Sequence, residues 1–347
     1  MTEFIRKFST TPLIQSALMS IEHARGFLEA AKLSDEWIEK MRTKALILEA
    51  NYTTHIEGTH LTLEQSEQLL KGIEVLNVDP DDVKELLNYK LAFDLVSDYV
   101  ASGEPITESL ICDIHEVLVS DVRGNVATPG EYRRQQNYIF NTKTKAVIYT
   151  PPKASHVPKM MEELINWLKC EKEIHPVLVA GIAQFQFVHI HPFLDGNGRT
   201  ARLLSTLCLY RAGYDFKRLF TISEYYDRDR TAYYRAIQQV RESSMDMTSW
   251  LEYFSVGLAS QIQEIEFAGH QMMKLTILSL EHGLSKREKM ILEHAYEKGD
   301  ISIESCQALC PKESIRTLQR DLRHLHELSL LTYVKEGMKR RYLAKEL

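Results

Sequence analysis

The chain has 347 residues, of which 44% are hydrophobic and 26% charged, and its formal net charge is −6 at pH 7. This is the ordinary composition of a water-soluble globular protein with length for two or three domains. The acidic balance excludes a protein that coats nucleic acid over its whole surface, but it leaves room for a local basic surface.

Neither a membrane segment nor a secretion signal is visible in the sequence. Its apolar runs fall short of the roughly 18 residues that a membrane span needs, and the N-terminus lacks the basic start and apolar stretch of a signal peptide. Five scattered cysteines fit reduced thiols better than a disulfide framework. Cys306 and Cys310 have no second ligand pair nearby, so we expect two buried apolar side chains there. The sequence therefore predicts a cytoplasmic protein.

Helical periodicity dominates the first hundred residues. Apolar side chains recur at helical spacing over 11–32, and a second helix is expected over 34–52. Thr62 is expected to cap a third helix, and Asp79 stands before a proline at the start of a fourth. We assign residues 1–100 to an N-terminal helical region.

Short β-prone runs interrupt the helical pattern further along. The runs 138–140 and 147–149 flank the polar segment 141–144, which predicts a β-hairpin. Later helices are expected over 155–169, 175–188, 200–212, 228–242 and 246–275. We assign residues 101–275 to one helical core that carries this hairpin.

From about Leu284 the pattern changes to short helices followed by two strands. Helices are expected from Lys286, over 301–309 and over 313–328, and a closing hairpin follows. This order resembles a winged helix-turn-helix, so residues 284–347 form the third expected domain.

The expected C-terminal domain has a mild basic bias. Residues 286–347 hold thirteen Lys or Arg against ten Asp or Glu. Contacts to DNA phosphates would fall on Arg316, Arg320 and Arg323 of the last helix and on Lys339, Arg340 and Arg341 of the wing. A winged helix that docks to protein or forms a dimer remains an open alternative.

Residues 191–202, His-Pro-Phe-Leu-Asp-Gly-Asn-Gly-Arg-Thr-Ala-Arg, carry the richest chemistry of the chain. They stand directly before an apolar helical run, and the free amides and dipole at the start of a helix favour an anion. Gly196 and Gly198 let the backbone approach a ligand without obstruction by a Cβ atom. The loop therefore predicts a phosphate cradle.

The side chains of this loop suit transfer of a phosphate-linked group. Asp195 is a hard oxygen ligand for Mg²⁺, and Arg199 and Arg202 can each bind phosphate oxygens with two N–H groups. His191 can accept a proton near neutral pH. His189 lacks a third metal ligand beside it, so we expect a structural histidine. Together the loop predicts phosphoryl or nucleotidyl transfer.

The loop also resembles the signature of the Fic family, His-Pro-Phe-x-[Asp/Glu]-Gly-Asn-[Gly/Lys]-Arg-x-x-Arg, with every defined position filled. The resemblance implies a mainly α-helical Fic bundle with a β-hairpin flap, and transfer of AMP from ATP to a Ser, Thr or Tyr hydroxyl of a protein. It makes His191 the general base and Asp195 the Mg²⁺ ligand. ATP contacts are implied for Gly196, Asn197, Gly198, Arg199 and Arg202. Gly198 stands where the phosphorylating Doc branch has Lys, which favours AMP transfer.

The resemblance extends to more distant elements. The flap residues Val147, Ile148 and Tyr149 would hold an extended target segment by main-chain pairing. Tyr233 and Tyr234 match a family element that lines the adenine pocket. Family members often pair, so the resemblance also implies a homodimer.

Upstream, Thr53-Thr54-His55-Ile56-Glu57-Gly58 is similar to the family's inhibitory motif, [Ser/Thr]-x-x-x-Glu-[Gly/Asn]. Thr53, Glu57 and Gly58 fill the defined positions. The resemblance implies that Glu57 pairs with Arg202 and takes the space of the ATP γ-phosphate. We therefore expect an autoinhibited adenylyltransferase. Two alternatives stay open: removal of AMP at the same site, with Glu57 positioning a water, and a DNA-binding transcriptional regulator with a Fic body as its sensor.

Overall fold

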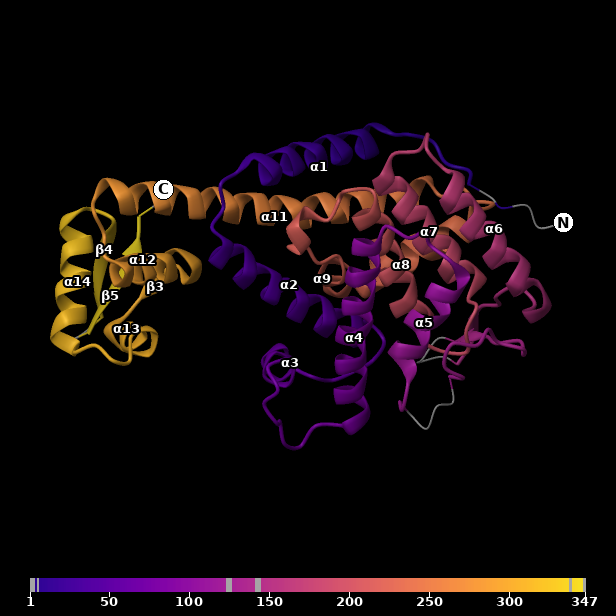
Figure 1. Cartoon of the computed structure of the whole chain (residues 1–347), viewed down its shortest axis with the longest axis horizontal. Coiled ribbons are helices and arrows are strands. Elements are labelled where there is room, and N and C mark those ends of the chain that lie inside the picture. The colour runs from indigo at the N-terminus through magenta and orange to yellow at the C-terminus, as the bar shows by residue number, and fades with distance from the viewer. Residues whose placement is uncertain (1–3, 5, 123–126, 141–144, 337–338, 346–347) are drawn as a thin grey trace. The chain divides into compact units, whose positions relative to one another are not determined.

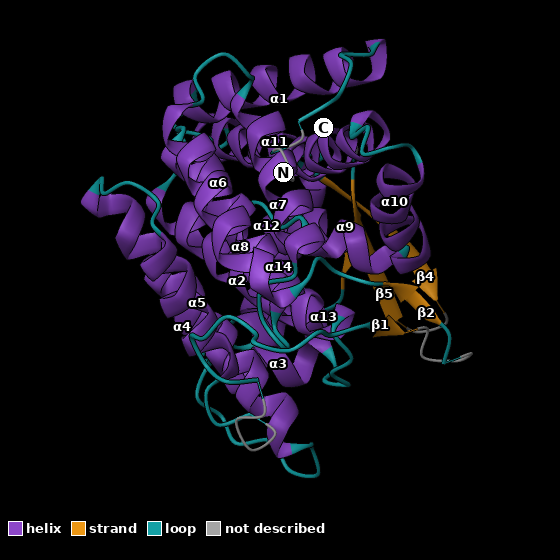
Figure 2. Cartoon of the chain, turned by 90° about the vertical axis from the view of Figure 1, so that its right-hand side faces the viewer, coloured by secondary structure: helices purple, strands orange, loops and turns teal. Residues whose placement is uncertain are grey.

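The computed structural model describes residues 4, 6–122, 127–140, 145–336 and 339–345, and most of these residues are helical (Figure 1; Figure 2, purple). The chain divides into two compact units. The first comprises Met1–Ala30 with Asp35–Ile265, and the second comprises Ala31–Ser34 with Glu266–Leu347. The predicted mainly helical fold with a small hairpin is confirmed.

The helices of the chain up to residue 281 are as follows. They are α1 (Pro12–Ala30), α2 (Asp35–Ile56), α3 (Leu63–Leu70), α4 (Pro80–Ser102), α5 (Glu108–Val119), α6 (Val157–Cys170), α7 (Pro176–Ile190), α8 (Asn197–Arg211), α9 (Ser223–Arg228), α10 (Arg230–Glu242) and α11 (Thr248–Glu281). Short 3₁₀ turns lie at Ala154–His156 and Phe216–Arg218. The predicted boundary at residue 100 lies inside α4, and the one at residue 275 lies inside α11.

Two helices begin directly after the N-cap residues predicted for them. The Thr62 side chain accepts a hydrogen bond from the amide of Gln65, whose own side chain accepts from the Thr62 amide, which makes a capping box. The Asp79 side chain accepts from the amide of Asp81 at the start of α4. The helix α2 continues to Ile56, so Thr53 lies in its last turn.

The core of the first unit forms around α7 and α8, which pack along each other (Figure 1). Helix α7 is buried on nearly every face, which explains why its sequence is apolar without a clear stripe. Gly181 gives α11 room to approach, because a Cβ atom there would lie 3.0 Å from the Phe254 ring. Trp250 of α11 donates a hydrogen bond to the Gly181 carbonyl oxygen at 2.8 Å. This packing fixes the end of α7, where the candidate site begins.

Two short strands, β1 (Ile139–Phe140) and β2 (Val147–Tyr149), form an antiparallel pair in the first unit. Ile139 lies opposite Tyr149, and Phe140 lies opposite Val147. The predicted turn at 141–144 lies outside the described residues. The hairpin itself agrees with the sequence pattern.

The second unit contains short helices and a three-stranded sheet. Its elements after α11 are α12 (Lys286–Lys298), β3 (Asp300–Ile301), α13 (Ile303–Leu309), α14 (Ile315–Glu327), β4 (Leu331–Glu336) and β5 (Lys339–Ala344). The sheet order is β3-β5-β4, and both pairings are antiparallel. The core includes Leu292, Leu322 and the fully buried Cys306, whereas Cys310 is half-buried. The predicted helices and closing hairpin are present, and β3 is additional.

No helix within the described ranges is long and apolar enough to cross a membrane. All five cysteines are free thiols.

Candidate functional site

The candidate site begins where α7 ends. His191 caps the C-terminus of α7 with φ 52° and ψ 61°, and its N–H donates to the Phe187 carbonyl oxygen at 2.9 Å. A residue with a side chain pays about 1–3 kcal/mol in this left-handed region unless its surroundings hold it there. The strained backbone of His191 therefore holds its imidazole in one position.

Arg133 supplies much of what holds this backbone. Its side chain is buried, and its Nε donates to the His191 carbonyl oxygen at 2.8 Å. Its own backbone N–H donates to the Pro192 carbonyl oxygen at 2.8 Å, and its Nη2 reaches the carbonyls of Pro152 and Ile190. No pattern in the sequence singles out Arg133, because these partners lie far from it along the chain.

The loop from Phe193 to Asn197 is closed by its own side chains. The Asn197 Oδ1 accepts from the Phe193 amide and its Nδ2 donates to the Phe193 carbonyl oxygen, both at 2.9 Å. Gly196 has φ 74°, and a Cβ atom there would lie 2.8 Å from Val119. The exposed Asp195 carboxylate accepts a hydrogen bond from the Gly196 amide at 2.7 Å. The first turn of α8 thus opens directly behind a rigid loop.

A second histidine, His115, packs against the loop. His115 of α5 lies flat on Phe193, with ring centres 3.6 Å apart and an interplanar angle of 1°. Its Nδ1 accepts from the Gly130 amide at 3.1 Å, and its Nε2 donates to the Asp195 carbonyl oxygen at 3.0 Å. Both bonds require the neutral ring. Burial lowers the pKa of His115 to about 4, which agrees with this assignment.

Three histidines, the buried His115 and the half-buried His189 and His191, make stability depend on pH. Burial is the main cause that lowers the pKa of His115, His189 and His191 to about 4 each, against about 6.5 in an unfolded chain. Between these values the unfolded state binds more protons, so stability falls as pH drops from 6.5 towards 4. We expect the melting temperature to fall between pH 7 and pH 5, and His115→Gln to lessen the fall. Replacing the exposed His282 should leave the slope unchanged; a flat profile for the wild-type chain would contradict this.

The inhibitory-motif residues meet the second arginine of the loop. The Arg202 Nη2 donates to the Glu57 Oε1 at 2.6 Å, and its Nε donates to the Thr53 Oγ1 at 2.6 Å. The same Nη2 also reaches the Thr53 carbonyl oxygen at 3.0 Å. The Arg202 side chain is 1% exposed and that of Glu57 is 26% exposed. Burial works to lower the pKa of Arg202, but the Glu57 carboxylate raises it above its ordinary value, so Arg202 stays charged.

Glu57 occupies a place that suits an anion. It follows the end of α2, where the helix dipole disfavours a carboxylate, and Gly58 turns the chain away with φ 109°. The carboxylate instead lies against Gly198 in the first turn of α8, where the dipole favours negative charge. Any side chain at position 198 would collide with it. Gly198 therefore leaves room for Glu57 at the expected phosphate position.

A polar cluster fastens the end of α2 to its neighbours. The His55 Nδ1 lies 2.9 Å from the Asp227 Oδ2, and the Arg230 Nε donates to the Asp227 Oδ1 at 2.7 Å. Asp227 belongs to α9 and Arg230 to α10. This cluster, which the sequence did not reveal, holds the segment that carries Glu57.

The first loop arginine has a different partner. The Arg199 Nη1 donates to the Glu85 Oε2 at 2.9 Å, and both side chains are at most 2% exposed. Removing one member of a buried pair leaves an uncompensated charge. Arg199 thus holds α8 against α4, and its contact with ATP stays a prediction.

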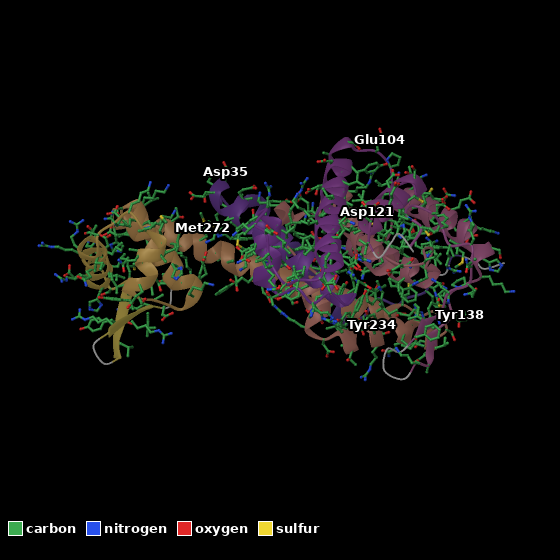
Figure 3. The ribbon with its side chains drawn as sticks, turned by 90° about the horizontal axis from the view of Figure 1, so that it is seen from below. Asp35, Glu104, Asp121, Tyr138, Tyr234 and Met272 are labelled. Atoms are coloured by element: carbon green, nitrogen blue, oxygen red, sulfur yellow. The ribbon has the colours of Figure 1, made fainter. Side chains whose placement is uncertain are left out.

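The two tyrosines expected near the adenine differ in exposure. Tyr233 is buried and stacks on Tyr226 with ring centres 4.4 Å apart, whereas Tyr234 is half-exposed. Figure 3 shows Tyr234 and Tyr138, the residue before β1, along one edge of the first unit. Tyr234 is therefore the better placed of the two to meet a ligand, and the role of both stays a prediction.

The hairpin presents apolar side chains outward. Val147 and Ile148 of β2 are half-exposed, as are Phe140 of β1 and Tyr138 just before that strand. Tyr149 points inward, and its hydroxyl contacts His189. The expected structural role of His189 agrees with this contact.

The Asp195 carboxylate at the loop suits a Mg²⁺ ion that binds together with ATP. Within the described residues no group of three or more His, Cys, Asp or Glu side chains is arranged to hold a metal. Mg²⁺ bound with phosphates needs only one or two protein carboxylates and keeps several waters. The exposed Asp195 carboxylate beside the first turn of α8 meets that requirement.

Parts of this chain resemble known proteins in sequence. Residues 105–209 match the model of the Fic/DOC family. The protein adenylyltransferase Fic of Drosophila willistoni is 28% identical over 300 residues, covering 83% of this chain and 57% of the relative. That of Drosophila ananassae is 31% identical over 212 residues, covering 59% of this chain and 41% of the relative. The chain thus spans about two fifths to three fifths of the length of these relatives.

Solved structures share the fold. A Fic family protein from Desulfovibrio desulfuricans G20 superposes with a TM-score of 0.65 and 24% identity, covering 98% of both chains. Fic-1 from C. elegans superposes with a TM-score of 0.64 and 21% identity, covering 75% of this chain and 74% of the other. At these identities the likeness bears on the fold alone.

Proposed function

We propose that this chain is a protein adenylyltransferase of the Fic/DOC type, and the match of residues 105–209 to the Fic/DOC family model supports the proposal. The chain transfers AMP from ATP to a Ser, Thr or Tyr hydroxyl of a protein and releases pyrophosphate. The observation that carries the proposal is the junction of α7 and α8. There a strained His191, the exposed Asp195 carboxylate and the first turn of α8 lie on one short loop.

His191 is the general base of this proposal. The hydroxyl oxygen attacks the α-phosphorus, the bond to the pyrophosphate oxygen breaks, and the hydroxyl proton passes to the imidazole. Burial lowers the pKa of His191 to about 4, so the ring is neutral and able to accept a proton at pH 7. Base catalysis of this kind contributes about 10²–10⁴ in rate.

The start of α8 binds the phosphates. Its free amides and dipole stabilise negative charge, and Gly198 lets the phosphate chain approach closely. Asp195 would hold Mg²⁺, which neutralises charge on the phosphate oxygens when it is bound with ATP. Arg202 can join them only when it is released from Glu57.

The proposal includes autoinhibition. Glu57 neutralises Arg202 and lies at the start of α8, so its carboxylate competes with a phosphate for both. ATP then binds in a pose that does not favour attack on the α-phosphorus. Movement of the end of α2 would free the site.

The position of the label in ATP tests the reaction type. We expect a Glu57→Gly variant to incorporate label from [α-³²P]ATP and none from [γ-³²P]ATP. Chelation of Mg²⁺ should reduce incorporation to background, because the phosphate charge is then uncompensated. Incorporation of the γ-label would instead show phosphorylation and contradict the proposal.

A second candidate function, binding of duplex DNA, is favoured by the outer face of α14. Arg316, Arg320 and Arg323 are all exposed there. The nearby Asp321 is buried and binds Arg287 through both carboxylate oxygens, and its Oδ1 also lies 4.0 Å from the Arg320 Nε. In the wing, Arg340 lies over the Tyr333 ring, Arg341 pairs with Asp300, and the Lys339 side chain lies outside the described residues.

Salt dependence tests this candidate. Alanine at Arg316, Arg320 and Arg323 should weaken binding of a labelled duplex and lower the slope of log K against log salt by about three. Alanine at the exposed Lys274, Lys286 and Lys298 removes the same charge elsewhere in this unit and should have less effect. Equal loss from both triple variants would contradict a binding face on α14.

A further inference from the structure

We propose that Arg241 is a positioning residue that fastens the hairpin to the end of α7 through Tyr149 and His189. Its effect on catalysis rests on the proposed function, whereas the fastening itself does not. The three side chains come from α10, β2 and α7, and they form a continuous chain of contacts that ends two residues before His191.

The first contact joins Arg241 to the hairpin. The guanidinium carbon lies 3.4 Å from the centre of the Tyr149 ring. Arg241 Nη1 donates to the Gln238 Oε1 at 3.2 Å, but Nε and Nη2 are buried and find no hydrogen-bond acceptor among the described residues. The face of the Tyr149 ring is therefore a main partner of this planar cation. Burial lowers the pKa of Arg241 to about 10, so the charge persists at pH 7.

The second contact joins the hairpin to α7. The Tyr149 hydroxyl oxygen lies 2.8 Å from the His189 Nδ1 and 2.8 Å from the His189 carbonyl oxygen. The hydroxyl has one proton, so both contacts are satisfied when it donates to the carbonyl and accepts from Nδ1–H. Phe185 stacks on the imidazole, with ring centres 6.0 Å apart. Tyr149 thereby fixes both the ring and the backbone of His189.

The hairpin needs such an anchor. Two strands of two and three residues have little stability of their own. Tyr149 is the strand residue that points inward, while its neighbours Val147 and Ile148 are half-exposed and available to a target segment. If Tyr149 moves, the target hydroxyl moves with the strand relative to His191. Arg133 ties the backbone just beyond the hairpin to Ile190, so Arg241 and Arg133 act on the same junction from two sides.

Hydrogen exchange tests the fastening without any reference to activity. In a Glu57→Gly chain, Arg241→Gln and Tyr149→Phe should each speed exchange of the hairpin amides by roughly tenfold and leave those of α8 unchanged. The matched control is Arg235→Gln, an exposed arginine on the same helix, which should change neither. Unchanged exchange in the hairpin would overturn the proposal. Tyr149→Phe keeps the stacked ring, so it remains informative if Arg241→Gln does not fold.

AMP incorporation by the same variants tests the consequence. Both variants should lose transfer by roughly ten- to a hundredfold while the Kd for MgATP stays the same. Arg241→Lys keeps a cation over the ring and should recover part of the loss. The double variant should lose no more transfer activity than the more impaired single variant, because both substitutions break the same chain of contacts. Faster exchange with unchanged transfer, or additive losses, would overturn the positioning role. Absence of transfer in the parent Glu57→Gly chain would count against the proposed function and not against the fastening.

Discussion

Replacement of Glu57 by Gly is expected to raise self-adenylylation from MgATP by about tenfold to a hundredfold. The reason is the 2.6 Å contact between Glu57 and Arg202, made by two charges of which one is buried. A hydrogen bond between charged groups contributes about 1.5–3 kcal/mol, which is the scale of this increase. The measurement is the initial rate of AMP incorporation at a fixed ATP concentration.

Two further variants define what the increase means. Glu57→Gln keeps the size of the side chain but loses its charge, so we expect an intermediate rate. Glu74→Gly changes an exposed glutamate in the loop between α3 and α4 and should leave the wild-type rate unchanged. Labelling of Glu57→Gly at or below the wild-type level would remove the case for autoinhibition.

Replacement of His191 in the Glu57→Gly chain is expected to reduce AMP transfer by about 10²–10⁴, the usual contribution of a general base. Binding of MgATP should persist, because the amides at the start of α8 do not depend on the imidazole. Calorimetry or a fluorescent ATP analogue measures binding beside the rate of transfer.

The backbone at position 191 dictates which variants to compare. His191 has φ 52°, which strains alanine but not glycine, so His191→Gly tests loss of the base with less risk to the fold. His156→Ala, which replaces an exposed histidine on a 3₁₀ turn, is the matched control. Transfer retained by His191→Gly would exclude this residue as the base.

Local signals in the sequence predicted the parts of the site that are close together along the chain. Residues 191–202 fall on the loop and first turns of α8, and Asn197 and Gly196 shape that loop in a way their residue types suggest. The pairing of Glu57 with Arg202 came from the resemblance alone, since 145 residues separate them. No periodicity could have joined them.

Residues that support the site from other elements were not predictable in this way. His115, Arg133 and Arg241 act through partners on other helices, strands and loops, and their meaning appears only after α5, α7 and α10 have packed. In a single sequence, such residues cannot be told apart from other polar residues that become buried.

Three helices or strands were not predicted from the sequence, and the two short ones have an explanation in their own residues. Strand β3 has two residues and α9 has six, which is too short for any periodicity to show. Helix α5 is different, because Thr107 caps it and its buried face includes Leu110, Ile114 and Leu118 at helical spacing. The expected helices do not include this one, which carries His115, although the pattern was present in the sequence.

We propose that the loop after His191 transfers AMP and that Glu57 holds it inactive. The most direct test is intact-protein mass spectrometry of three chains after incubation with MgATP: wild type, Glu57→Gly, and Glu57→Gly with His191→Gly. We expect a mass increase of one or more AMP groups in the Glu57→Gly chain, little or none in the wild type, and none in the double variant. Equal modification of all three chains, or none in Glu57→Gly, would contradict it.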